Sequence, residues 1–308
     1  MPWSDQFYSG TVTNVFGSGV GDGVTNNSSA FSGFTNPTVI GPGNYLISTN
    51  TTISQPLNFQ PGARITVASG VTVTINAPVY ANKYQRIFDG TGTVNGTFGS
   101  CALSIGWFGA VANANVATGA GTDNTAAINR ALSARTRSNT VAHVVLVPAG
   151  RWLVSGTLTV TLGACFAGEA MDSSFLLVTT GATGNIVYLP NAEGPPTTVR
   201  DMTVSGFNGA AGATGIGCFA NGAQLENLWV SGFHTCFLLA STGVFLRQFV
   251  AEHAAQGDQY GIRVTSDNTT ISDGHVFETT TGIHVDQTLN SGADRKSTRL
   301  NSSHLGIS

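Results

Sequence analysis

Charged residues are scarce in this chain. Asp, Glu, Lys and Arg make up 9% of its 308 residues and the net charge is -3, whereas an average soluble domain has about 25% charged residues. A chain without a basic surface lacks the electrostatic footprint that nucleic acids or anionic membranes require. No apolar run reaches the roughly 18 residues of a membrane-spanning helix. We therefore expect neither a nucleic-acid partner nor membrane insertion.

Motifs for metals, disulfides and secretion are also missing. The four cysteines are widely spaced without a CxxC pair, which argues against a zinc site or a disulfide framework and favours four buried apolar residues: Cys101, Cys165, Cys218 and Cys236. The opening "MPWSDQFYSG" lacks the basic and apolar regions of a signal peptide, so any export would use another route. No phosphate loop, calcium loop or Ser-His-Asp frame is found. We expect no cofactor and no metal.

Glycine is abundant, with 39 residues, and Thr, Ser, Val and Asn are common as well, which favours short strands and tight turns. Between residues 199 and 285 two series of short segments recur at intervals of roughly 21 to 26 residues. One series has a polar residue at its third position: Asp201, Asn227, Gln248 and Asp273. The other begins at Gly215, Cys236, Gly261 and Gly282. Each repeat therefore contains at least two strands.

Alternating apolar residues within these segments point inward, and stacked repeats would bury them in one continuous column. We predict an all-β fold, a right-handed parallel β-helix of about 21 to 26 residues per coil. A leucine-rich repeat has a similar period, but its L-x-x-L-x-L frame is absent. The recurrent polar residue is expected to lie at a bend and to form a structural ladder rather than a functional site.

A coarser repeat joins the two halves of the chain. "GVTNNSSAF" (23–31) with "GPGNYLISTNTTI" (41–53) recurs as "GTDNTAAINRAL" (121–132) with "VPAGRWLVSGTLTV" (147–160). In the second copy Thr122 or Asp123 can cap a helix whose apolar residues fall at helical spacing. We predict a short N-terminal capping helix that shields the open end of the stack.

These segments resemble a known family. "GWFGAVANANVATGAGTDNTAAINRAL" followed by "VVLVPAGRWLVSGTLTV" is similar to the opening of the pectate-lyase superfamily β-helix found in bacteriophage tailspikes and rhamnogalacturonase-like proteins. The resemblance covers residues 105–293, with a fainter echo across 12–80, and it departs from the family pattern in the loop 111–121. It implies the β-helix fold and a polysaccharide or cell-surface glycan as partner. It does not imply pectate cleavage, because a calcium-type acidic cluster is not evident.

Three segments are expected along the chain. Residues 1–104 form a β-rich segment that echoes the β-helix opening, residues 105–293 form a truncated β-helix domain, and residues 294–308 form a non-native tail. The tail "DRKSTRLNSSH" (294–304) is identical to one translated frame of a widely used sequencing adapter. We therefore expect that read-through of the adapter replaced the natural continuation after Ala293.

Candidate site residues come from outward columns of successive coils, which lie about 4.8 Å apart. One column is Thr203, Trp229, Val250 and His275, and the next places Glu252 beside a turn column that contains His253 and Glu278. Paired carboxylates can hydrolyse a glycosidic bond, so we predict catalysis by Glu252 and Glu278, with Asp258 in the following loop. Trp229, His253 and His275 are predicted to bind the sugar. The alternative is an ordinary solvated face, with Trp229 in an inter-chain contact.

The function expected from these residues is polysaccharide binding by a tailspike-like protein, with cleavage by hydrolysis or, second, elimination left open. A non-catalytic shaft or receptor-binding module of a phage tail fibre or secreted adhesin is the competing expectation. The apolar outward residues Val250 and Phe277 favour burial between subunits, as in a homotrimer. The expected location is the virion, in a phage tail, or the extracellular space.

Overall fold

The structure is a computed structural model that describes residues 19–33, 35–134, 143–191, 194–252 and 260–286. The predicted tail 294–308 lies outside these residues. The chain divides into two compact units, unit 1 (residues 1–110 and 133–144) and unit 2 (111–132 and 145–308). None of the described helices is long and apolar enough to cross a membrane.

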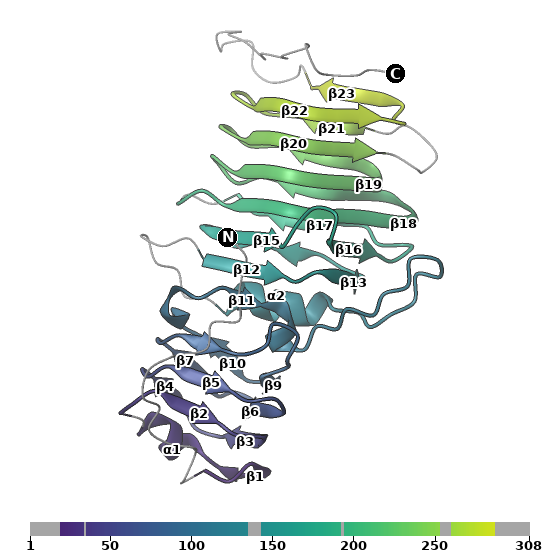
Figure 1. Ribbon diagram of the computed structural model, residues 1–308. Helices are drawn as coiled ribbons and strands as arrows, with labels where there is room; N and C mark the ends of the chain where they lie inside the picture. Colours follow the sequence, from purple (N-terminus) through teal and green to yellow (C-terminus); the bar gives the residue numbers. More distant parts are fainter. Residues whose placement is uncertain (1–18, 34, 135–142, 192–193, 253–259, 287–308) are drawn as a thin grey trace. The chain divides into compact units, whose positions relative to one another are not determined.

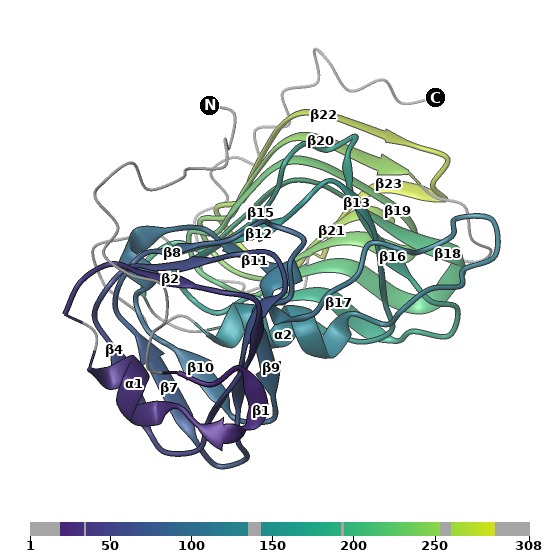
Figure 2. The same ribbon diagram turned by 60° about the horizontal axis from the view of Figure 1, so that its bottom comes forward.

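Unit 1 is built from three small parallel sheets (Figures 1 and 2). The first joins β1 (Asp22–Asn26), β3 (Gly43–Ile47), β6 (Ala63–Val67) and β9 (Phe88–Gly90). The second joins β4 (Thr51–Ile53), β7 (Thr72–Ile75) and β10 (Thr93–Asn95), and the third joins β2 (Thr38–Ile40), β5 (Leu57–Phe59) and β8 (Val79–Tyr80). Strands alternate between inward apolar and outward polar residues, as a sheet with one buried face requires. The shorter elements are α1 (Ser28–Ser32), η1 (Phe98–Ser100), β11 (Leu103–Ser104) and η2 (Ile105–Phe108).

Unit 2 is a parallel β-solenoid whose strands stack coil upon coil (Figure 1). The early coils contain β12 (His143–Val147), β13 (Gly150–Val154), β14 (Leu158–Thr159), β15 (Ala164–Gly168), β16 (Ser174–Val178) and β17 (Gly184–Leu189). Longer strands follow, namely β18 (Thr198–Cys218), β19 (Gln224–Leu239), β20 (Phe245–Glu252), β21 (Tyr260–Val264), β22 (Thr270–Phe277) and β23 (Thr281–Val285). The predicted all-β parallel β-helix is confirmed.

The polar third position of each repeat is the residue at which the coil bends. Asp201, Asn227, Gln248 and Asp273 all have left-handed backbone, with φ of 59, 51, 51 and 54°. The strand register skips each of them, pairing the residues on either side instead. Asn227 Nδ2 donates to Asp201 Oδ1 at 2.8 Å, which links two successive bends. The recurrent bend is therefore present, and a side-chain ladder is formed at least between its first two coils.

The predicted short helix is present as α2 (Thr125–Ser133), but it is not at the N-terminus of the chain. It lies in mid-chain because another copy of the same opening precedes it. Burial alone would raise the pKa of Asp123, yet hydrogen bonds from Ser155 and Thr125 outweigh it and lower that pKa. The Asp123 carboxylate thus remains charged while it joins the start of the helix to the coil that contains Ser155.

The two openings share one hydrogen-bond pattern, so the coarse sequence repeat is a structural duplication. Asn27 and Asn124 are both buried, and in each case the backbone N–H donates to a carbonyl across the coil, at Leu46 and Leu153 respectively. The side-chain amide of each also bonds the backbone N–H and C=O of a residue in the preceding segment, Val20 and Val111 respectively. The same set of hydrogen bonds around a buried asparagine therefore begins both solenoid units.

The cysteines differ from the prediction at one position. Cys165, Cys218 and Cys236 are buried, and burial raises the pKa of the Cys218 and Cys236 thiols to about 12. Cys101 is only partly buried, because it follows the 3-10 turn η1 and not a core strand. The prediction of four buried cysteines is therefore wrong for Cys101.

Candidate functional site on two walls of unit 2

Strand β19 contributes to two different outer walls of unit 2. Its residues 224–231 pair with β20, which in turn pairs with β22, and we name this surface the glutamate wall. Its residues 235–239 pair with β21, which pairs with β23, and we name this surface the ring wall. Gly232, with φ of 76°, lies between the two halves, where the chain turns from one wall to the other.

The glutamate wall shows the register expected from the sequence. Thr203 pairs with Trp229, Trp229 with Val250, and Val250 with His275. In the neighbouring column Ser231 pairs with Glu252, and Glu252 with Phe277. Trp229 is 36% exposed and His275 is exposed, so both side chains are accessible to a ligand.

Trp229 and Glu252 are in direct contact. The indole N–H of Trp229 donates to Glu252 Oε2 at 3.1 Å. Glu278 follows Phe277, the register partner of Glu252, and it is exposed with left-handed backbone, φ 53°. The two glutamates therefore end adjacent coils on one wall. His253 and Asp258 lie outside the described residues.

The ring wall carries a column of three rings that we did not predict. The ring centroids of His234 and Tyr260 are 6.0 Å apart, and those of Tyr260 and His284 are 5.0 Å apart. The Arg263 guanidinium lies 5.9 Å from the centre of the Tyr260 ring and donates to Asp286 at 3.0 Å. These side chains come from three successive coils, so the column runs along the stacking direction.

The Arg263 side chain retains hydrogen-bonding capacity beside these rings. Its Nε is buried and, within the part of the chain that the structure describes, has no hydrogen-bond partner. Buried donors normally find a partner, so the unpaired Nε is unusual. The Arg263 side chain as a whole is 41% exposed, so its guanidinium is within reach of a ligand oxygen. Arg263 and His284 occupy equivalent register positions in the repeated "GIRV" and "GIHV" segments, which is the sequence signal that could have indicated this wall.

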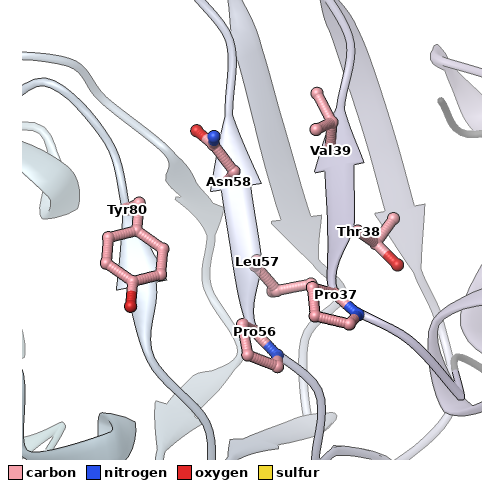
Figure 3. Close-up of a pocket in the computed structure, with 7 residues that line it drawn as sticks. All are labelled: Pro37, Thr38, Val39, Pro56, Leu57, Asn58 and Tyr80. Atoms are coloured by element: carbon pink, nitrogen blue, oxygen red, sulfur yellow. The ribbon is translucent and has the colours of Figure 1, made fainter. Parts of the chain in front are cut away.

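Unit 1 has a shallow pocket of its own, with about 200 Å³ of empty space that includes its open side (Figure 3). It lies on the third sheet of unit 1 and is lined by Pro37, Thr38, Val39, Pro56, Leu57, Asn58 and Tyr80. Over the described ranges no group of three or more His, Cys, Asp or Glu side chains is placed to hold a metal ion.

Unit 2 is a stack of parallel coils. One outer wall carries the paired tryptophan and glutamate, and another carries the column of rings. These features define unit 2 as a β-helix domain with ligand-accessible outer walls. Residues 110–308 match the model of the family described as rhamnogalacturonase A/epimerase, pectate lyase-like, and the chain belongs to that family. No curated protein matches the chain. Among solved structures, ORF18 of Geobacillus virus E2 is similar over 88% of this chain, with 10% identity and a TM-score of 0.26. This chain spans 57% of that protein.

Proposed function

We propose that this protein binds a polysaccharide along the ring wall of unit 2. The observation that carries the proposal is the column of His234, Tyr260 and His284 with Arg263 beside it. Sugar rings pack their C–H faces on aromatic rings, while guanidinium and imidazole groups bond hydroxyl or carboxylate oxygens. Family membership supports this ligand class, because the family description names a rhamnogalacturonase and an epimerase.

Binding is tested by exposing the full chain to an array of bacterial capsular and plant cell-wall polysaccharides. We expect the protein to retain at least one of them at micromolar concentration. A protein that retains none of the arrayed polysaccharides would argue against the proposal. The protein is, in this proposal, a tailspike-like glycan binder of a virion or of the extracellular space, as the resemblance of its opening segments to tailspikes implies.

We further propose that the glutamate wall cleaves the bound polysaccharide. Glu252 is held by the Trp229 indole, and Glu278 ends the adjacent coil, so the two carboxyl groups can act as acid and base on one glycosidic bond. Trp229 and His275 would hold the sugar. Asp258 and His253 remain predicted members of the site.

Replacement of both glutamates by glutamine is expected to lower the release of reducing ends by about 10² to 10⁴-fold, because general acid–base catalysis is lost. Binding to the array should persist, since the ring wall is unchanged. Glu226→Gln is the matched control: Glu226 lies on the same sheet but pairs with Arg247 at 2.9 Å. Full activity of the double variant would overturn the assignment, and a product with new ultraviolet absorbance would indicate elimination instead of hydrolysis.

A non-catalytic shaft is the second candidate, favoured by apolar side chains on the outside of the glutamate wall. Phe245 is 49% exposed, and Val250 and Phe277 are only partly covered. Such residues are suited to contacts between copies of the chain, as in a homotrimer. Light scattering should then give three times the mass of one chain, whereas a monomer that cleaves a glycan would contradict the shaft.

A further inference from the structure

The ring wall continues past the column of rings into the earlier coils of unit 2. Its strands pair in the order β14, β17, β18, β19, β21 and β23. One outward position recurs in register on the last five of these strands, and we name its residues the middle row: Tyr188, Gly217, Leu238, Arg263 and His284. The middle row therefore joins the column of rings to coils that the proposed function does not use.

A second pair of rings lies at the other end of the middle row. The ring centroids of Tyr188 and Phe219 are 5.6 Å apart, with an interplanar angle of 63°. Phe219 belongs to the coil after Tyr188, because it follows Cys218, the register partner of Leu189. Both rings are only partly buried. They form an aromatic surface that spans two coils.

An amide group lies between this aromatic pair and the column of rings. Gly217 pairs with Tyr188 on one side and Leu238 on the other, and it has no side chain. A Cβ atom at Gly217 would collide with the side chain of Asn185, which therefore occupies that place in the middle row. Asn185 is only partly buried, so its amide offers donors and an acceptor beside the rings.

We propose that Tyr188, Phe219 and Asn185 form a second sugar-binding subsite, so that the ring wall binds a linear glycan running along the stacking direction. Successive coils lie about 4.8 Å apart, which is close to the length that one pyranose adds to an extended glycan. A glycan along the middle row would place about one sugar over each coil, or about five sugars from Tyr188 to His284. The second subsite rests on the proposed function, because the same glycan must also contact the column of rings.

The side chains of the second subsite suit a sugar. The rings of Tyr188 and Phe219 can pack against the C–H face of a pyranose, and the Asn185 amide can bond its hydroxyl groups. A glycan long enough to reach this subsite gains affinity, because its contacts with the column of rings already hold it close to the second set.

Fragments of two sizes test the second subsite on the full chain. The polysaccharide retained on the array is cut by mild acid, and fragments of about three and about six sugars are isolated by size. Calorimetry should show that the wild type binds the longer fragment about tenfold more tightly. Tyr188→Ala and Asn185→Ala should each weaken binding of the longer fragment about fivefold and leave that of the shorter one within about twofold. Tyr188→Phe, which keeps the ring, should bind both fragments like the wild type.

Two further variants separate the second subsite from the column of rings. Tyr260→Ala should weaken binding of both fragments, and Tyr84→Ala, which removes an exposed tyrosine of unit 1, should change neither. Circular dichroism checks that each variant is folded. The second subsite is refuted if the wild type binds both fragments equally. It is also refuted, with the ring wall retained, if Tyr188→Ala and Asn185→Ala bind the longer fragment like the wild type while Tyr260→Ala weakens it.

Failure of the proposed function gives a different result. Either Tyr260→Ala binds both fragments as tightly as the wild type, or the array retains no polysaccharide at all. Each of these outcomes would refute glycan binding on the ring wall and the second subsite together.

Discussion

Replacement of Asn124 by alanine is expected to lower the free energy of unfolding by about 3 kcal/mol or more. The side chain is 1% exposed and makes four hydrogen bonds. It accepts from Val111 N–H at 2.7 Å and donates to the carbonyls of Val111, Thr122 and Leu153 at 3.1, 2.9 and 3.2 Å. Alanine would remove all four bonds, three of them partly buried and the one to Leu153 fully buried, and each buried group left without a partner costs about 1–3 kcal/mol.

Urea denaturation followed by tryptophan fluorescence measures the effect, since Trp152 is fully buried in the same opening. Asn113→Ala is the matched control, because Asn113 lies in the preceding loop and bonds Thr122 at an exposed position. We expect the control to change the free energy of unfolding by less than about 1 kcal/mol. An Asn124→Ala protein as stable as the control would show that the opening does not depend on this side chain.

Replacement of Tyr260 by alanine is expected to weaken polysaccharide binding by about 10 to 100-fold. Tyr260 is the central ring of the column, in contact with the rings of His234 and His284 and close to the Arg263 guanidinium. Its removal would take away the largest apolar face and leave a gap between the two histidine rings. A bound glycan would therefore lose a stacking surface and the unbroken row of rings.

Affinity electrophoresis in gels that contain the bound polysaccharide gives the dissociation constant for each variant. Tyr260→Phe should bind within about threefold of the wild type, because the ring is retained. Tyr84→Ala in unit 1 controls for the loss of an exposed tyrosine elsewhere. If Tyr260→Ala bound as tightly as the wild type, the polysaccharide would have to lie on another surface.

The fold could be predicted from the sequence because its signals are local and repeated. The third-position polar residues mark the bends, since Asp and Asn tolerate left-handed backbone better than other non-glycine residues. The duplicated opening could be predicted from matching segments. The prediction of an N-terminal helix was wrong because it treated the second copy of the opening as the start of the stack, although the first copy, residues 23–53, precedes it.

The candidate site could be predicted only in part. The outward column of Trp229, Val250 and His275 follows from counting along the repeats, and the register confirms it. The contact between Trp229 and Glu252 was not predicted, because the two residues occupy neighbouring columns and meet only through the rotamer of a large side chain.

The ring wall was missed for a physical reason. His234 precedes Thr235, which is the register partner of Tyr260, while His284 pairs with Arg263. The three rings therefore come from staggered positions and meet by leaning along the strands. Aligning equivalent residues of each coil cannot reveal such a cluster, since side-chain direction decides which rings touch.

Amide hydrogen exchange with and without the polysaccharide retained on the array tests whether the glycan lies on the ring wall. We predict slower exchange on binding in residues 234–239, 260–264 and 281–285, the backbone of the ring wall. At a concentration that saturates the wild type, the same polysaccharide should slow exchange in these three segments less in Tyr260→Ala than in the wild type. Binding that slows exchange elsewhere and leaves all three segments unchanged would contradict the claim that this wall holds the glycan.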